Sequence, residues 1–75
     1  MDMVDVLFYI RPELSSEERA KIESELWEYE GVLSVHFNQK YHHLLTVEYN
    51  PHVINSAMLL NRVGSNGVSA CRIGL

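Results

Sequence analysis

The chain has 75 residues, a length that allows one compact domain, residues 1–75, with a single core. Hydrophobic residues make up 47% and charged residues 21%, a balance typical of a folded chain and not of a disordered one. The formal net charge is −4 and no run of Lys or Arg offsets it, so we expect no nucleic-acid partner. No stretch approaches the roughly 18 apolar residues of a membrane span, and the start lacks the basic region of an export signal. We therefore expect a cytoplasmic protein without membrane insertion.

Charge is unevenly distributed along the chain. Residues 1–31 carry nine acidic and three basic side chains, whereas residues 32–75 carry one acidic and three basic side chains. This distribution favours a protein partner with a basic face.

The chain has a single cysteine, Cys71, which excludes an internal disulfide and any metal site that needs several thiolates from one chain. A nucleophilic role for Cys71 would require a base and an acid that orients the base, and Glu48 is the one acid of the second half. We therefore expect no enzymatic activity, and we expect Cys71 and Met58 to fill core positions.

The first half of the chain has the pattern of a strand, a helix and a strand. Residues 4–10 are mostly apolar, branched or aromatic, which predicts a buried strand. Residues 15–30 place apolar side chains three and four apart, which predicts an amphipathic helix. Ser15 followed three positions later by Glu18 predicts a capping box at its start. Residues 32–38 predict a second strand.

The second half repeats this order. Residues 43–49 alternate apolar and polar side chains and predict a third strand, joined to the second by a short hairpin. Asn55 or Ser56 can cap a second helix that runs through Val63. Residues 68–73 predict the last strand.

The order of these elements defines an α+β fold, the ferredoxin-like βαββαβ sandwich. Right-handed crossovers place both helices on one face of a four-stranded antiparallel sheet. The other face of the sheet is then left open.

Three segments carry a resemblance beyond this order: residues 30–35 (Glu-Gly-Val-Leu-Ser-Val), 46–51 (Thr-Val-Glu-Tyr-Asn-Pro) and 66–70 (Asn-Gly-Val-Ser-Ala). Their order and spacing resemble the heavy-metal-associated domain, and the likeness runs from the first strand to Ala70. The resemblance implies the same βαββαβ fold. It also implies docking onto related domains of metal transporters or carriers.

Members of that family carry Met-x-Cys-x-x-Cys between the first strand and the first helix, and the two thiolates bind copper(I), zinc or other soft cations. Counting back from Gly31 places the cysteines on Ser15 and Glu18 and the methionine on Glu13. The thiolate motif is therefore absent, and we expect no resident cofactor. Ser15 and Glu18 are instead expected to cap the helix.

Histidines offer an alternative metal site. Imidazole binds zinc, nickel and copper(II), and His36 on the second strand could join His42 or His43 near the hairpin in weak binding of such an ion. Neighbours on an extended strand point to opposite faces, so we expect one of His42 and His43 to take part unless the turn bends them together.

An apolar patch is predicted on the open face of the sheet. If the first strand buries Val6, Phe8 and Ile10, then Leu7 and Tyr9 face outward, beside Leu44 of the third strand. Such a patch favours a protein partner or a homodimer. RNA binding would need basic residues around Tyr9, which this strand does not supply.

Trp27 lies off the apolar stripe of the first helix and is a second candidate interaction residue. The sequence therefore predicts a small non-enzymatic domain that acts as a protein-interaction or regulatory module linked to metal handling. The alternative is a metal-ion binding or transport protein that uses a non-thiolate His/Glu site.

Overall fold

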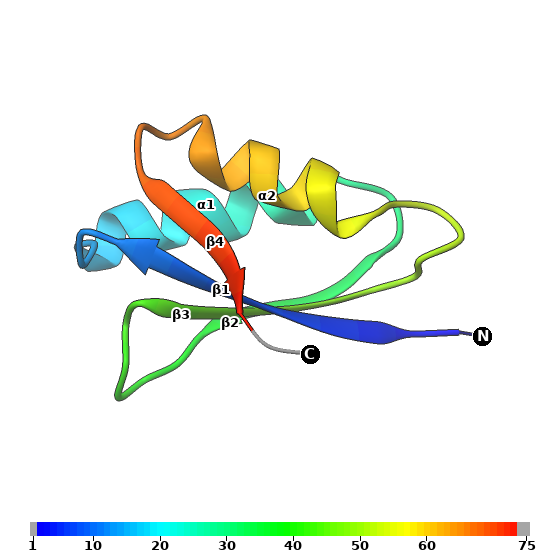
Figure 1. Ribbon diagram of the computed structural model, residues 1–75, viewed down its shortest axis with the longest axis horizontal. Coiled ribbons are helices and arrows are strands. Elements are labelled where there is room, and N and C mark those ends of the chain that lie inside the picture. Colours follow the sequence, from blue (N-terminus) through cyan, green and yellow to red (C-terminus); the bar gives the residue numbers. More distant parts are fainter. Residues whose placement is uncertain (1, 74–75) are drawn as a thin grey trace.

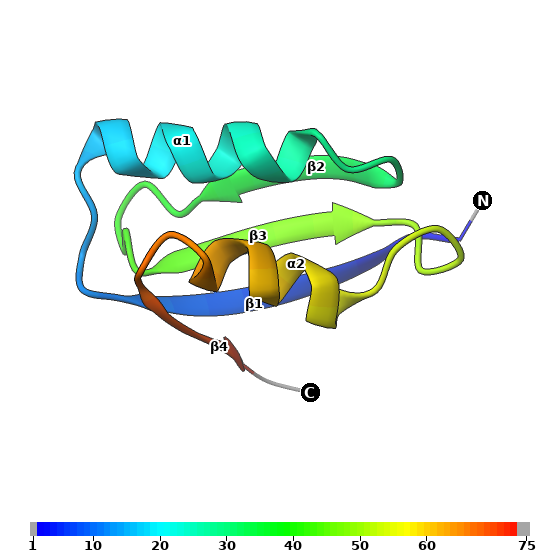
Figure 2. The same ribbon diagram turned by 90° about the horizontal axis from the view of Figure 1, so that it is seen from above.

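The computed structural model describes residues 2–73, and the predicted order of elements is confirmed (Figure 1). The elements are β1 (Val4–Arg11), α1 (Ser16–Trp27), β2 (Val32–Phe37), β3 (Leu44–Tyr49), α2 (Ser56–Gly64) and β4 (Ser69–Ile73). The strands form one antiparallel sheet in the order β2-β3-β1-β4. Both helices lie on the same side of the sheet (Figures 1 and 2). This is the predicted ferredoxin-like sandwich.

The core lies between the sheet and the helices. Alternate residues of the two central strands are buried on this side: Val6, Phe8 and Ile10 on β1, and Leu45, Val47 and Tyr49 on β3. The helices cover them with Ile22 and Leu26 from α1 and with Leu59 and Val63 from α2. Full burial of one such side chain stabilises the folded state by about 1.5–3 kcal/mol relative to leaving it exposed. The alternation therefore determines which face of each strand is left outward.

The predicted boundaries are close to the observed ones, with two differences that affect the site. The third strand begins at Leu44 and not at residue 43, so His43 lies in the turn that precedes it. Helix α1 ends at Trp27, three residues before the predicted end. The backbone N–H of Glu28 donates to the carbonyl of Glu25, and that of Tyr29 donates to the carbonyl of Leu26.

Two predicted core residues are exposed. Cys71 pairs with Tyr9 across β1 and β4, and this register places it on the outward side of the sheet. Met58 is next to the buried Leu59 on α2, but it lies on the outer side of the helix and is 46% exposed. The prediction that both residues fill the core is wrong, because strand register turns Cys71 outward and the position of Met58 on α2 turns it to the outer side of the helix.

The last strand is tied to the helix layer. The guanidinium of Arg72 on β4 donates a hydrogen bond to Ser56 Oγ (3.0 Å) at the start of α2.

Neither helix in residues 2–73 has the length and apolar composition needed to cross a membrane.

Candidate functional site

Ser15, the last residue of the loop between β1 and α1, caps the start of α1 together with Glu18. Ser15 Oγ accepts a hydrogen bond from the backbone N–H of Glu18 (3.2 Å), and Glu18 Oε1 accepts one from the backbone N–H of Ser15 (2.9 Å). These two bonds are the predicted capping box. The backbone N–H of Ser15, followed by its hydroxyl, lowers the pKa of the Glu18 carboxyl. A hydroxyl and a carboxylate that satisfy the helix start do not fit copper(I), which prefers thiolates.

The hairpin after β2 brings two histidines to this loop. Asn38 Oδ1 accepts hydrogen bonds from the backbone N–H groups of Lys40 and Tyr41, which shapes the turn. His42 Nδ1 then lies 3.4 Å from Glu13 Oε2, and His43 Nε2 lies 3.8 Å from Glu13 Oε1. The turn therefore bends both histidines toward one carboxylate.

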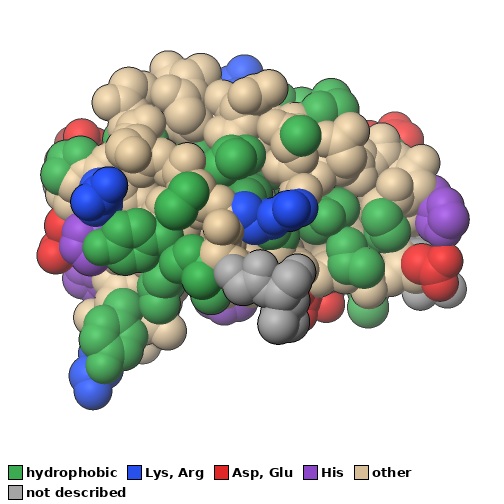
Figure 3. All heavy atoms as spheres, viewed as in Figure 1, with side chains coloured by type: hydrophobic (Ala, Val, Ile, Leu, Met, Phe, Trp, Pro, Cys, Tyr) green, Lys and Arg blue, Asp and Glu red, His purple; other side chains and the backbone are tan. Residues whose placement is uncertain are grey.

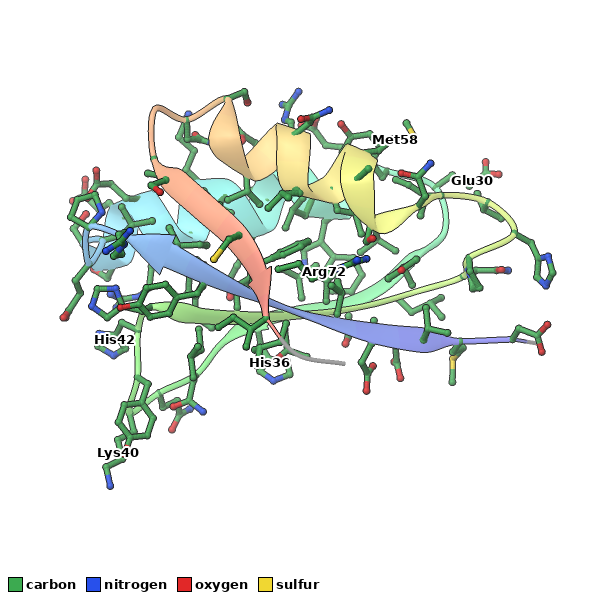
Figure 4. The ribbon with its side chains drawn as sticks, viewed as in Figure 1. Glu30, His36, Lys40, His42, Met58 and Arg72 are labelled. Carbon is green, nitrogen blue, oxygen red and sulfur yellow. The ribbon has the colours of Figure 1, made fainter. Side chains whose placement is uncertain are left out.

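His36 is not brought to this group. It is exposed on β2 and lies opposite Thr46 of β3 on the open face. Figure 4 shows His36 below the middle of the sheet, whereas His42 lies at the hairpin end. Within residues 2–73, no three histidine, cysteine or acidic side chains form a metal site as they stand.

The open face of the sheet carries a continuous apolar strip. On β1, Tyr9 lies between Leu44 and Cys71, and Leu7 lies between Thr46 and Ile73. Leu7, Tyr9 and Leu44 are half-buried, and Ile73 is 39% exposed. We call Leu7, Tyr9, Leu44 and Ile73 the open-face strip. Hydrophobic side chains gather between β4 and the hairpin in Figure 3. The role of β4 in this strip was not expected from the sequence, because it depends on strand pairing.

One end of the strip is bounded by aromatic and polar groups around Tyr9. The rings of Tyr9 and His43 are stacked, with centroids 5.3 Å apart and planes 25° from parallel. The guanidinium of Arg11, the last residue of β1, lies 5.9 Å from the centre of the Tyr9 ring, so the strand does supply one basic group beside Tyr9, contrary to the expectation from sequence. Tyr9 therefore links the open-face strip to the histidines of the hairpin.

The other end of the strip is acidic. Asp5 of β1 and Glu48 of β3 lie directly opposite each other, on the outward side of their strands. Like charges in this arrangement are unfavourable. Among residues 2–73, neither carboxylate forms an ion pair with a basic side chain. A cationic group that approached this end would relieve their repulsion.

Trp27 belongs to a different surface. It is 50% exposed on α1, in the layer on the opposite side of the sheet from the open-face strip. The sequence-predicted interaction residues therefore lie on two separate faces.

Comparison with known proteins identifies the fold. No family model matches the chain, and no curated protein matches it by sequence. Among solved structures, the CopZ metallochaperone is 15% identical, with 91% of this chain and 100% of that chain covered and a TM-score of 0.82. Oxidized MerP from Ralstonia metallidurans CH34 is 12% identical, with 97% and 100% covered and a TM-score of 0.84. The N-terminal domain of a potential copper-translocating P-type ATPase from Bacillus subtilis, in its Cu(I)-loaded state, is 26% identical, with 92% and 85% covered and a TM-score of 0.82.

These likenesses confirm that the chain has the ferredoxin-like fold of heavy-metal-associated domains. The similar structures include a metallochaperone and a Cu(I)-loaded domain of a potential copper-translocating P-type ATPase. The single cysteine of the present chain is on β4 and not in the loop between β1 and α1.

Proposed function

We propose that this protein is a non-enzymatic, cytoplasmic interaction module that has kept the heavy-metal-associated scaffold and lost its thiolate pair. It binds a protein partner of the metal-handling machinery through the open face of its sheet. The observation that carries this proposal is the open-face strip, in which four apolar side chains from three adjacent strands lie on the side of the sheet away from both helices. Burying apolar surface against a partner contributes about 25 cal/mol of favourable free energy per Å² removed from water.

The charges beside the strip specify the partner. The Asp5–Glu48 pair at one end favours a lysine or arginine that contacts both carboxylates. A partner that places an apolar side chain over Tyr9 and Leu7 and a basic side chain over this pair fits the face best.

The similar structures support a partner linked to metal handling. They include a metallochaperone and a domain of a potential copper-translocating ATPase. A domain with the same shape and no thiolate pair can occupy a docking surface without exchanging copper(I). By occupying that docking surface, the domain would regulate a metal-handling protein.

Affinity capture followed by mapping tests the proposal. The wild type, the double variant Tyr9→Ser/Leu44→Ser and the control Trp27→Ser are used as baits, because Trp27 is an exposed aromatic residue on the opposite layer. A partner is assigned to the open face if the double variant loses it, the control keeps it, and its amide shifts map to β1 and β3. Partners that bind all three baits equally would contradict the proposal.

A second copy of the chain is the alternative occupant. Analytical ultracentrifugation across concentration separates the two cases. A monomer that captures a partner supports the proposal, whereas a dimer that the double variant abolishes would assign the face to self-association.

A further inference from the structure

The side chains of Glu13, His42 and His43 form a cluster that neither helix capping nor partner docking explains. Glu13 is in the loop after β1, and the two histidines are in the hairpin between β2 and β3. Both segments lie at the same end of the molecule (Figure 1). The carboxylate is 62% exposed, and the two imidazoles are about half as exposed, at 33% and 31%.

Hydrogen bonds on the far side of each ring determine which nitrogen carries hydrogen. His43 Nδ1 lies 2.7 Å from the carbonyl oxygen of Ile10, and His42 Nε2 lies 3.0 Å from the carbonyl oxygen of Gln39. A carbonyl oxygen only accepts, so these two nitrogens are the donors. In the neutral rings, His43 Nε2 and His42 Nδ1 therefore present lone pairs.

Both lone pairs face the Glu13 carboxylate, whose oxygens also lack hydrogen when ionised. A nitrogen lone pair that faces a carboxylate oxygen is unfavourable unless a cation lies between them. The two nitrogen–oxygen distances, 3.4 and 3.8 Å, exceed the usual hydrogen-bond range of about 2.7–3.2 Å. They are close to the separation of about 3.4 Å between two ligands that bind one metal tetrahedrally through bonds of about 2.1 Å.

We propose that Glu13, His42 and His43 bind a divalent transition-metal ion of the zinc class through Glu13 Oε, His42 Nδ1 and His43 Nε2. Two imidazoles and one carboxylate suit zinc, nickel or copper(II) and do not suit copper(I). The three ligands do not converge on one point as they stand. Closing the set requires movement of the exposed Glu13 side chain and of the two imidazoles, and three protein ligands leave at least one coordination position open.

The carbonyls of Ile10 and Gln39 serve as supporting groups. A metal-bound histidine commonly donates its other ring N–H to a backbone carbonyl, which fixes the tautomer and the ring orientation. Here both histidines have this arrangement before any ion binds. His43 also stacks on Tyr9, so an ion bound to His43 would change the surroundings of the Tyr9 ring at the end of the open-face strip.

Zinc titration of the isotope-labelled protein tests the inference, and it needs no partner, so its failure is distinct from failure of the docking proposal. Imidazole ¹⁵N resonances are followed at about pH 7.5, where histidine is ordinarily neutral. We expect saturable shifts at His42 Nδ1 and His43 Nε2 and at the Tyr9 ring. Glu13→Gln, His42→Ala and His43→Ala should each weaken zinc binding by at least about tenfold.

Two matched variants serve as controls. His36→Ala removes an exposed histidine outside the cluster, and Glu18→Gln removes a nearby carboxylate in the first turn of α1; both should retain zinc affinity. Amide spectra confirm that each variant is folded. Unchanged His42 and His43 resonances up to about 1 mM zinc would overturn the inference. Binding that depends on His36 and not on Glu13 would overturn it as well.

Discussion

Gly31 illustrates how a single position fixes the connection between α1 and β2. Its φ is +95°, a conformation that side-chain-bearing residues rarely adopt, and a Cβ there would lie 2.8 Å from Val53 Cβ. Its carbonyl also accepts a hydrogen bond from the backbone N–H of Asn50 (2.8 Å), which joins the start of β2 to the end of β3. The residue is therefore restricted by both conformation and space.

Substituting the three glycines that lie within residues 2–73 separates the effect of conformation from the effect of space. Gly67 also has a positive φ, +79°, but open space around it, and Gly64 has neither restriction. Gly31→Ala should destabilise the fold most, Gly67→Ala by about 1–3 kcal/mol from strain alone, and Gly64→Ala least. Urea unfolding of the three variants measures this order. A Gly31→Ala variant as stable as Gly64→Ala would contradict the described contact with Val53.

Ser15 acts at the same scale on the start of α1. Ser15→Ala removes the hydroxyl that accepts from the Glu18 N–H, and we expect a loss of about 0.5–2 kcal/mol of stability in urea unfolding. Ser15→Asn offers another capping oxygen and should recover most of the loss. Equal stability of wild type and Ser15→Ala would show that the cap is unimportant.

At the scale of elements, the two helices are joined by a polar contact around Glu25. Its carboxylate accepts a hydrogen bond from the Asn66 side chain (2.8 Å) and lies near Lys21 and Arg62. The hydrogen bond from Asn66 is the largest cause, ahead of Lys21 and Arg62, of a lowered pKa at Glu25. The charged form of Glu25 is therefore favoured in the folded protein.

The sign of the pH dependence follows from this direction. A carboxyl whose folded-state pKa is depressed contributes stability above its ordinary value of 4.5 and loses it as the pH falls through the folded value. Glu25→Gln should therefore be less stable than wild type near pH 7, and the difference should shrink below about pH 4.5. Urea unfolding at several pH values measures it. A difference that grows in acid would contradict the assigned contacts.

The elements could be predicted from the sequence because their signals are local. Ser15 and Glu18 mark one helix start, and alternation along residues 44–49 marks a strand. The contacts of the site are not local. Cys71 faces outward because of its pairing with Tyr9, and Glu13 meets His43 because a hairpin folds back over a loop. The local hydrophobic pattern of the sequence does not predict this strand pairing or this contact between two loops.

At the scale of the whole molecule, the open-face strip and the Glu13 cluster are neighbouring surfaces that are linked by Tyr9 and His43. The helix layer covers the core, and the opposite face carries the open-face strip. The stacked rings of Tyr9 and His43 connect that strip to the Glu13 cluster. An ion bound at the hairpin end and a protein bound on the sheet are therefore expected to influence each other. Zinc should change the affinity for the partner, and the partner should change the affinity for zinc by the same factor.

The charge at the acidic end makes a prediction about the partner. Asp5→Lys/Glu48→Lys reverses both carboxylates without touching the apolar side chains of the strip. Binding of a partner with a basic side chain should weaken by about tenfold or more, and the loss should be smaller at high salt. Calorimetry with the captured partner at two salt concentrations measures this effect. Unchanged affinity at low salt would show that the partner does not use this end.

Amide-shift mapping of the captured partner on the labelled chain tests most directly whether the open sheet face binds a protein partner. We predict that shifts concentrate on β1 and β3 around Leu7, Tyr9 and Leu44, and that Tyr9→Ser/Leu44→Ser abolishes them while its own spectrum stays folded. Shifts centred on α1 around Trp27, with the double variant still binding, would contradict the account.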